Sequence, residues 1–328
     1  MAVRNEANWG GGGWLRWTDL ALVRARLAAG ADPHRGDQPY NDPPLHEAAE
    51  HGSPEVVAEL AGHVDDVDML HDGRSALWRA VYADRLDNAR ALVAGGADPW
   101  LPMMSGWSPA RLSLAGSTPH LFAAALGTPG LTPAEVAAVA EARRLTEALG
   151  EFHYEGLGLA CVAGIDVAEA ARRLGAVPVE EDVAEFLDEE VSDFFDLTVV
   201  GATDVPGGVV LTQPWGFAPS MPGVGGLLSA GTVCYAMYAN PKNGAQGSIL
   251  VDGVIRGWDL YPGGEPEEAD PPELVLASYV YRHRSLAYCC AFADLRLTDR
   301  RPVTGPADRW LRLPERDWSR WPWRRSGG

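Results

Sequence analysis

The sequence predicts a multidomain chain in which an all-α solenoid is followed by an α+β domain with an antiparallel sheet. The sequence Gly30-Ala31-Asp32-Pro33 recurs as Gly96-Ala97-Asp98-Pro99, an offset of 66 residues or two periods of 33. Apolar residues between the two copies recur at helical spacing. Beyond about residue 151, short alternating apolar stretches separated by glycine-rich turns are typical of strands.

Each 33-residue unit has the pattern of two short helices. In the second unit, Leu45, Ala48 and Ala49 form the apolar stripe of an inner helix. Ser53 and Pro54 begin the next, outer helix, because serine is a common N-cap and proline suits the first helical position. Small alanines allow the paired helices to approach closely.

The period and the sequence Pro44-Leu45-His46-Glu47-Ala48-Ala49, together with the repeated Gly-Ala-Asp-Pro, resemble the ankyrin repeat. The resemblance covers residues 14–126 in three to four units, of which the end units are degenerate, as expected for the caps of a stack. Ser75-Ala76 and Trp78 depart from the threonine-proline and histidine of the motif.

Ankyrin stacks bind proteins through their loop tips and inner helices and normally carry out no chemistry, so the resemblance implies a protein partner. Carried onto this sequence, it assigns protein binding to exposed inner-helix positions: Glu47, Glu50, His51, Arg79 and Tyr82. The alternative is that these side chains are solvated surface.

The rest of the chain divides by composition. A capping box at Thr132-Pro133-Ala134-Glu135 predicts a linker or capping helix within 127–150. An α+β domain is expected over 151–300, with its strongest hairpin signal at Asp252-Gly253. An acidic amphipathic helix is expected over 180–196. Residues 301–328 form a tail rich in arginine and tryptophan.

The second domain resembles an uncharacterised actinobacterial domain family that is found fused to ankyrin repeats. The resemblance rests on 158–176, 228–233, Asp252-Gly253 with Asp259, and 285–298. It implies no known activity and supplies no catalytic residue.

No catalytic, cofactor or metal site is expected. His46 and His51 are five residues apart and diverge by roughly 140° on a helix, so they cannot share a metal ion. The glycine run 223–226 lacks the spacing of a dinucleotide site and is interpreted as a flexible loop. Four cysteines, at 161, 234, 289 and 290, are expected to be buried and reduced.

The formal net charge of −18 argues against binding to nucleic acid or anionic lipid. With no apolar leader and no apolar stretch of about 18 residues, a cytoplasmic protein is expected. Lys242 is the single lysine, a usage that favours a GC-rich bacterial coding sequence. From residue 296 onward there are nine arginines and four acidic residues. The tail is therefore expected to lie across the acidic helix.

The preferred function is a protein-interaction module that binds a partner through the helical stack and presents the second domain. One alternative is an enzyme with an unrecognised site in the second domain, near Trp215, Trp258, Asp252 and Asp259. Another is an immunity or antitoxin-like protein that neutralises a basic partner. The sequence leaves the partner and the oligomeric state open.

Overall fold

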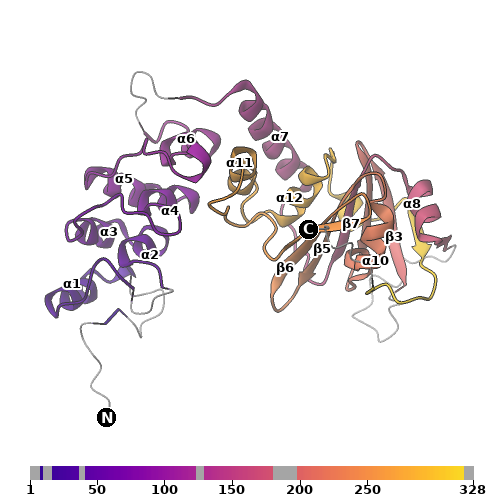
Figure 1. Cartoon of the computed structure of the whole chain (residues 1–328), viewed down its shortest axis with the longest axis horizontal. Coiled ribbons are helices and arrows are strands. Elements are labelled where there is room, and N and C mark those ends of the chain that lie inside the picture. Colours follow the sequence, from indigo (N-terminus) through magenta and orange to yellow (C-terminus); the bar gives the residue numbers. More distant parts are fainter. Residues whose placement is uncertain (1–7, 10–16, 37–40, 123–128, 180–197, 321–328) are drawn as a thin grey trace, which may run out of the picture. The chain divides into compact units, whose positions relative to one another are not determined.

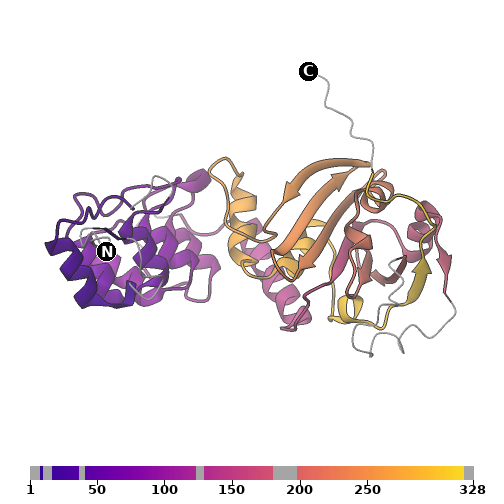
Figure 2. The same cartoon turned by 90° about the horizontal axis from the view of Figure 1, so that it is seen from below.

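The chain forms two compact units, seen in a computed structural model that describes residues 8–9, 17–36, 41–122, 129–179 and 198–320 (Figures 1 and 2). Unit 1 comprises residues 1–137 together with 265–280, and unit 2 comprises 138–264 together with 281–328. No helix in the described part of the chain is long and apolar enough to cross a membrane.

Unit 1 is a stack of paired helices. One row of neighbouring helices contains α2, α4 and α6, and a second row contains α1, α3 and α5. The bounds are α1 Leu20–Ala28, α2 Pro44–His51, α3 Pro54–Ala61, α4 Ala76–Tyr82, α5 Leu86–Ala94, η2 Met104–Gly106 and α6 Pro109–Ala115. The predicted inner and outer helices are thereby confirmed.

Local signals explain where these helices begin and how they pack. The hydroxyls of Ser53, Ser75 and Ser108 each accept a hydrogen bond from a backbone N–H in the first turn of the following helix. Ala48 and Ala49 are completely buried, so the two rows meet closely at the inner helix α2. Buried Asn88 in α5 donates through its side-chain nitrogen to carbonyl oxygens at the end of α2, where the last turn of a helix has no intrahelical donors.

Residues 265–280 join unit 1, although they lie far along the chain from the repeats. They include α11 (Pro272–Val280), which packs beside α6 and η2 (Figure 1). The predicted boundary of one continuous domain over 151–300 is therefore wrong. Composition can divide a chain only into consecutive stretches. This segment instead accepts hydrogen bonds from side chains of unit 1 that precede it in the sequence by about 165 residues or more.

Unit 2 contains an eight-stranded sheet in the order β2-β8-β3-β4-β1-β5-β6-β7, and every neighbouring pair is antiparallel. Its strands are β1 Gly158–Ala163, β2 Val177–Pro178, β3 Val199–Val205, β4 Gly208–Gln213, β5 Val233–Asn240, β6 Gly244–Val251, β7 Val254–Asp259 and β8 Arg309–Arg312. Asp252 and Gly253 both have positive φ, 50° and 73°, which confirms the predicted hairpin.

Helices cover both faces of this sheet. The remaining bounds are α7 Pro133–Leu149, α8 Val167–Leu174, η3 Ala218–Ser220, α10 Pro222–Leu228, α12 Ser285–Phe292 and α13 Arg301–Thr304. On one face, α8 and α10 pack into a buried core that includes Leu228 and Leu250. On the other, Cys289 and Cys290 of α12 contact Met237 and Cys161. The chain between β7 and α12 includes segment 265–280 of unit 1, and α7 begins in unit 1 and ends in unit 2.

The C-terminal tail belongs to the sheet. Its strand β8 lies between β2 and β3, and Leu311, Leu313 and Trp318 are buried in the core. The predicted separation of residues 301–328 from the domain is therefore wrong. The acidic stretch 180–196 lies outside the described residues, so the expected contact between tail and acidic helix stays a prediction.

Candidate protein-binding surface of the helical stack

The predicted binding residues lie on two neighbouring inner helices and form two differently exposed groups. Glu47, Glu50 and His51 on α2 are partly exposed and define what we call the α2 surface. Arg79 and Tyr82 on α4 are 9% and 6% exposed, so the expectation that they face solvent is wrong. The reason is that residues 265–280, called segment 265–280 below, bind both of them.

Arg79 links the two groups electrostatically. Its guanidinium lies 3.0 Å from an oxygen of Asp42, 3.2 Å from Glu50 and 3.9 Å from Glu265. Burial acts to lower the pKa of Arg79, but the charges of Glu265, Asp42 and Glu50 outweigh it and hold the pKa above its ordinary value. A buried cation thus holds three carboxylates, one of which belongs to segment 265–280.

Segment 265–280 is bound through its main chain as well as its side chains. Four side chains of the stack donate hydrogen bonds to its carbonyl oxygens. They are Arg74 to Pro266, Ser105 to Asp270 (2.5 Å), Trp107 to Pro272 (2.9 Å) and Tyr82 to Ser278 (3.0 Å). Since every residue offers a carbonyl, these four donors recognise an extended or helical backbone in this position more than a particular side chain.

Apolar contacts and one ion pair complete this interface. The rings of Tyr82 and Tyr279 lie 5.6 Å apart, and Tyr279 is 2% exposed. A Cβ atom at Gly116 would lie 2.4 Å from the hydroxyl of Tyr279, so a larger residue at this helix end would force the Tyr279 ring to shift. Arg74 lies 2.7 Å from the carboxylate of Glu265. We call the face formed by Arg74, Arg79, Tyr82, Ser105 and Trp107 the α4–α6 surface.

Comparison with known proteins agrees with this architecture. A family model for ankyrin repeats matches residues 16–102 in three copies. Residues 16–102 are ankyrin repeats. The rest of the chain carries no family match, and no curated protein matches the chain. Ankyrin repeats generally mediate protein–protein interaction, which makes both surfaces of this stack candidates for binding.

His46 of the ankyrin motif has the structural role that its place in the repeat predicts. It is 1% exposed, and its Nε2 lies 3.0 Å from the carbonyl oxygen of Arg74, which fixes Nε2 as the protonated nitrogen. Its Nδ1 is buried without a hydrogen-bond partner. Burial, opposed by the bond to Arg74, lowers the pKa of His46 to about 4.

We expect this histidine to make the stack less stable in acid. The unfolded chain binds a proton at His46 near its ordinary pKa of 6.5, but the folded chain does so only near 4. Stability is therefore unaffected above about pH 6.5 and falls as the pH drops from about 6.5 to about 4, by on the order of 3 kcal/mol. Urea denaturation at several pH values should show a weaker pH dependence for His46→Gln than for the wild type. The exposed His63→Gln is the control, and equal slopes for all three proteins would contradict the assignment.

A group of metal-ligand type lies beside this histidine. Asp42, His71 and Asp72 each offer one ligand atom, all within 4.8 Å of one another. His71 lies 3.0 Å from one oxygen of Asp42, while Arg79 lies 3.0 Å from the other. A divalent cation here would compete with a guanidinium already paired to the same carboxylate. This group could not be predicted from the sequence, because Asp42 and His71 are far apart in the chain and show no ligand spacing.

The residues named for an enzymatic alternative in unit 2 do not gather into one site. Asp252 accepts a hydrogen bond from the backbone of Gly231, and Asp259 accepts one from the hydroxyl of Tyr235, so both stabilise turns or strand ends. Trp215 and Trp258 are 54% and 56% exposed. None of the four residues lines the pocket described next.

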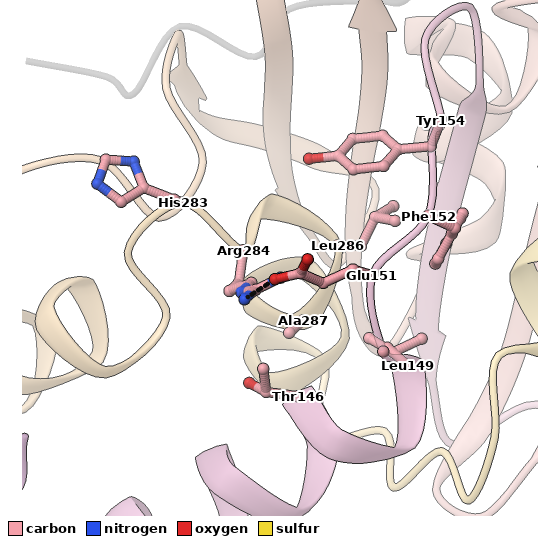
Figure 3. A pocket seen from close by; sticks show the side chains of 10 residues that line it. Thr146, Leu149, Glu151, Phe152, Tyr154, His283, Arg284, Leu286 and Ala287 are labelled. Carbon is pink, nitrogen blue, oxygen red and sulfur yellow. Dashed lines mark hydrogen bonds and ion pairs between the residues drawn. The ribbon is translucent and has the colours of Figure 1, made fainter. Parts of the chain in front are cut away.

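This pocket of unit 2 has a volume of about 230 Å³ and lies between the end of α7 and the start of α12 (Figure 3). The carboxylate of Glu151 lies 2.6 Å from the guanidinium of Arg284 within it. The ring of His283 points away from this ion pair (Figure 3). Phe152 and Tyr154 supply aromatic lining. The arrangement can hold a small polar molecule, but it presents no nucleophile beside a base.

The four cysteines are buried and free, as expected. Burial raises the pKa of Cys234 to about 12 and that of Cys289 well above its ordinary value. A thiol is nucleophilic as its thiolate, so these two side chains are unreactive near neutral pH.

Proposed function

We propose that the chain is a protein-interaction module whose ankyrin stack binds a partner protein and links it to unit 2. The observation that carries the proposal is that the inner-helix side of the stack already binds a peptide, segment 265–280, through four side-chain donors. The α2 surface continues the same side of the stack, and its Glu47 and His51 are partly exposed. It is therefore available to a second macromolecule.

Charge favours a basic partner at the α2 surface. Residues 1–137 and 265–280 of unit 1 contain 22 acidic and 10 basic side chains. Glu47 and Glu50 add local negative charge, which would steer a basic protein towards this helix. The same charge supports the second candidate function, neutralisation of a basic toxin. We propose binding rather than catalysis, because the pocket that holds Glu151 and Arg284 presents no nucleophile beside a base.

The test is affinity capture from the native cell with the full chain. The test variant carries Glu47→Gln and His51→Ala, which alter the α2 surface but leave Glu50 and Arg79 in place. Trp17 donates to Glu47 across 3.3 Å, and glutamine keeps an acceptor there. We expect the specific partners to be lost or reduced at least tenfold.

A matched control carries Glu55→Gln in the outer helix α3 and His63→Ala just beyond the end of this helix, and both side chains are exposed. It should retain every partner of the wild type. If the test variant captured the same proteins in the same amounts, the α2 surface would not be the binding face. Partner release at about 1 M salt would support a basic partner, because surface attraction is screened.

A further inference from the structure

The α4–α6 surface differs from the α2 surface in the sign of its charge and in being covered by another segment of the chain. Arg74 and Arg79 give it positive charge, and segment 265–280 covers it with acidic residues. The segment contains five acidic residues and no basic residue. Two surfaces of opposite character thus lie on one ankyrin stack.

We propose that the α4–α6 surface is a peptide-binding site whose resident ligand is segment 265–280, and that it accepts in exchange an acidic peptide of a partner protein. Such a peptide resembles segment 265–280. It has an acidic extended stretch that reaches Arg74 and Arg79, followed by a short apolar helix that packs against Tyr82. This inference concerns a different surface from the proposed function and stands independently of it.

The distribution of contacts supports exchange. In the first half of the segment, Glu267, Glu268 and Ala269 are exposed, and the side chain of Glu265 is 35% exposed. Partly exposed ion pairs contribute little net stability. The acidic half can therefore open locally while the rest of the stack stays folded.

The second half defines what a competing ligand must supply. Val275, Leu276 and Tyr279 of α11 are buried, so an acidic stretch alone cannot replace the segment. The hydrogen bonds from Trp107 and Tyr82 go to the carbonyl oxygens of Pro272 and Ser278, and another peptide backbone can provide these acceptors. The site therefore favours peptides in which acidic residues are followed by an apolar helical turn, and the exact sequence matters less.

Tethering sets the expected affinity. A segment in the same chain competes at a high effective concentration, so an external peptide binds the wild type weakly. A substitution that weakens only the binding of segment 265–280 raises the fraction of chains whose site is vacant. The affinity for the external peptide then rises by the same factor.

The experiment measures the anisotropy of a fluorescent synthetic peptide with the sequence of residues 265–280, titrated with the full chain. Glu265→Gln in the chain removes the resident's ion pair with Arg74 but leaves the surface unchanged. We expect this variant to bind the peptide roughly fivefold more tightly than the wild type. Glu267→Gln, the same charge change at an exposed position of the segment, should match the wild type.

Two further arms show where the peptide binds. Adding Arg74→Gln to the Glu265→Gln variant should remove most of the gain, because it deletes the ion pair that Glu265 of the peptide makes and that the resident segment has already lost. Tyr82→Phe removes the same hydrogen bond from the peptide and from the resident segment, so the gain should survive it. A scrambled peptide of the same composition should bind no better to the variant than to the wild type. Equal peptide affinity in wild type and Glu265→Gln, or a gain that survives Arg74→Gln, would overturn the proposal.

Hydrogen exchange tests the premise even if the peptide binds too weakly to measure. Amides of α11 should exchange faster in Glu265→Gln than in the wild type, while those of α3 stay unchanged. If α11 exchanged as slowly as α3 in both proteins, segment 265–280 would be a permanent part of the core and the exchange model would be wrong.

Discussion

Deletion of residues 305–328 is expected to destabilise unit 2 by on the order of 5 kcal/mol or more. The deletion removes β8, which pairs with both β2 and β3. It also removes the side chains of Leu311, Leu313 and Trp318 from the core. Each fully buried side chain of this size contributes about 1.5–3 kcal/mol through burial alone. The loss is comparable with the whole stability of a typical domain, so we expect unit 2 to melt at a much lower temperature or to be unfolded.

Calorimetry of the full chain and of the deletion variant checks this, and point substitutions show which contacts matter. Leu311→Ala should cost about 2–5 kcal/mol, because it leaves a cavity at a completely buried position. Arg309→Ala in the same strand is exposed and should change stability by less than about 0.5 kcal/mol. An unchanged melting temperature after the deletion would show that the tail is not part of the folded unit.

The repeats could be predicted because their signals are local. The buried alanines and the N-cap Ser53 each act within a few residues, the period of 33 repeats such signals along the chain, and the structure has helices where they place them. The hairpin at Asp252-Gly253 is predictable for the same reason, since positive φ at both residues requires small or permissive side chains.

Some elements were missed because their stability comes from distant partners. The glycine run 223–226, interpreted as a flexible loop, lies inside α10. A Cβ atom at Gly225 would lie 2.9 Å from the side chain of Leu250, and one at Gly223 would lie 2.8 Å from the carbonyl oxygen of Trp318. These glycines allow a helix to pack closely, a requirement that no pattern within α10 itself reveals. The four-residue strand β8 was missed because two of its residues are exposed arginines.

The candidate binding surface could likewise be predicted only in part from the sequence. Glu47, Glu50, Arg79 and Tyr82 could be placed on inner helices from the motif, but the burial of Arg79 and Tyr82 depends on a segment more than 180 residues away. The sequence of that segment, acidic and then apolar, is typical of an ordinary surface loop and helix. Nothing in it identifies Arg74 and Arg79 as its partners before the chain is folded.

Arg79→Met should destabilise unit 1 by about 3–5 kcal/mol. The side chain of Arg79 is 10% exposed and faces the carboxylates of Asp42, Glu50 and Glu265. Methionine fills part of the space but leaves Asp42 and Glu50 without this guanidinium, whereas Glu265 keeps its ion pair with Arg74. Removing one partner of a buried ion pair is costly because the remaining charge is desolvated and unpaired. The partial exposure of the carboxylates, 22–35%, places the effect towards the lower end of this range.

Urea denaturation of the full chain, followed through its unit 1 transition, measures the loss. Arg90→Met on α5, where the arginine side chain is 61% exposed, is the matched control and should change stability by less than about 0.5 kcal/mol. Adding Glu50→Gln to Arg79→Met should recover part of the lost stability, because one of the two carboxylates left without the guanidinium is then neutral. If the double variant were no more stable than Arg79→Met alone, the cost would come from lost packing of the Arg79 side chain and not from unpaired charge.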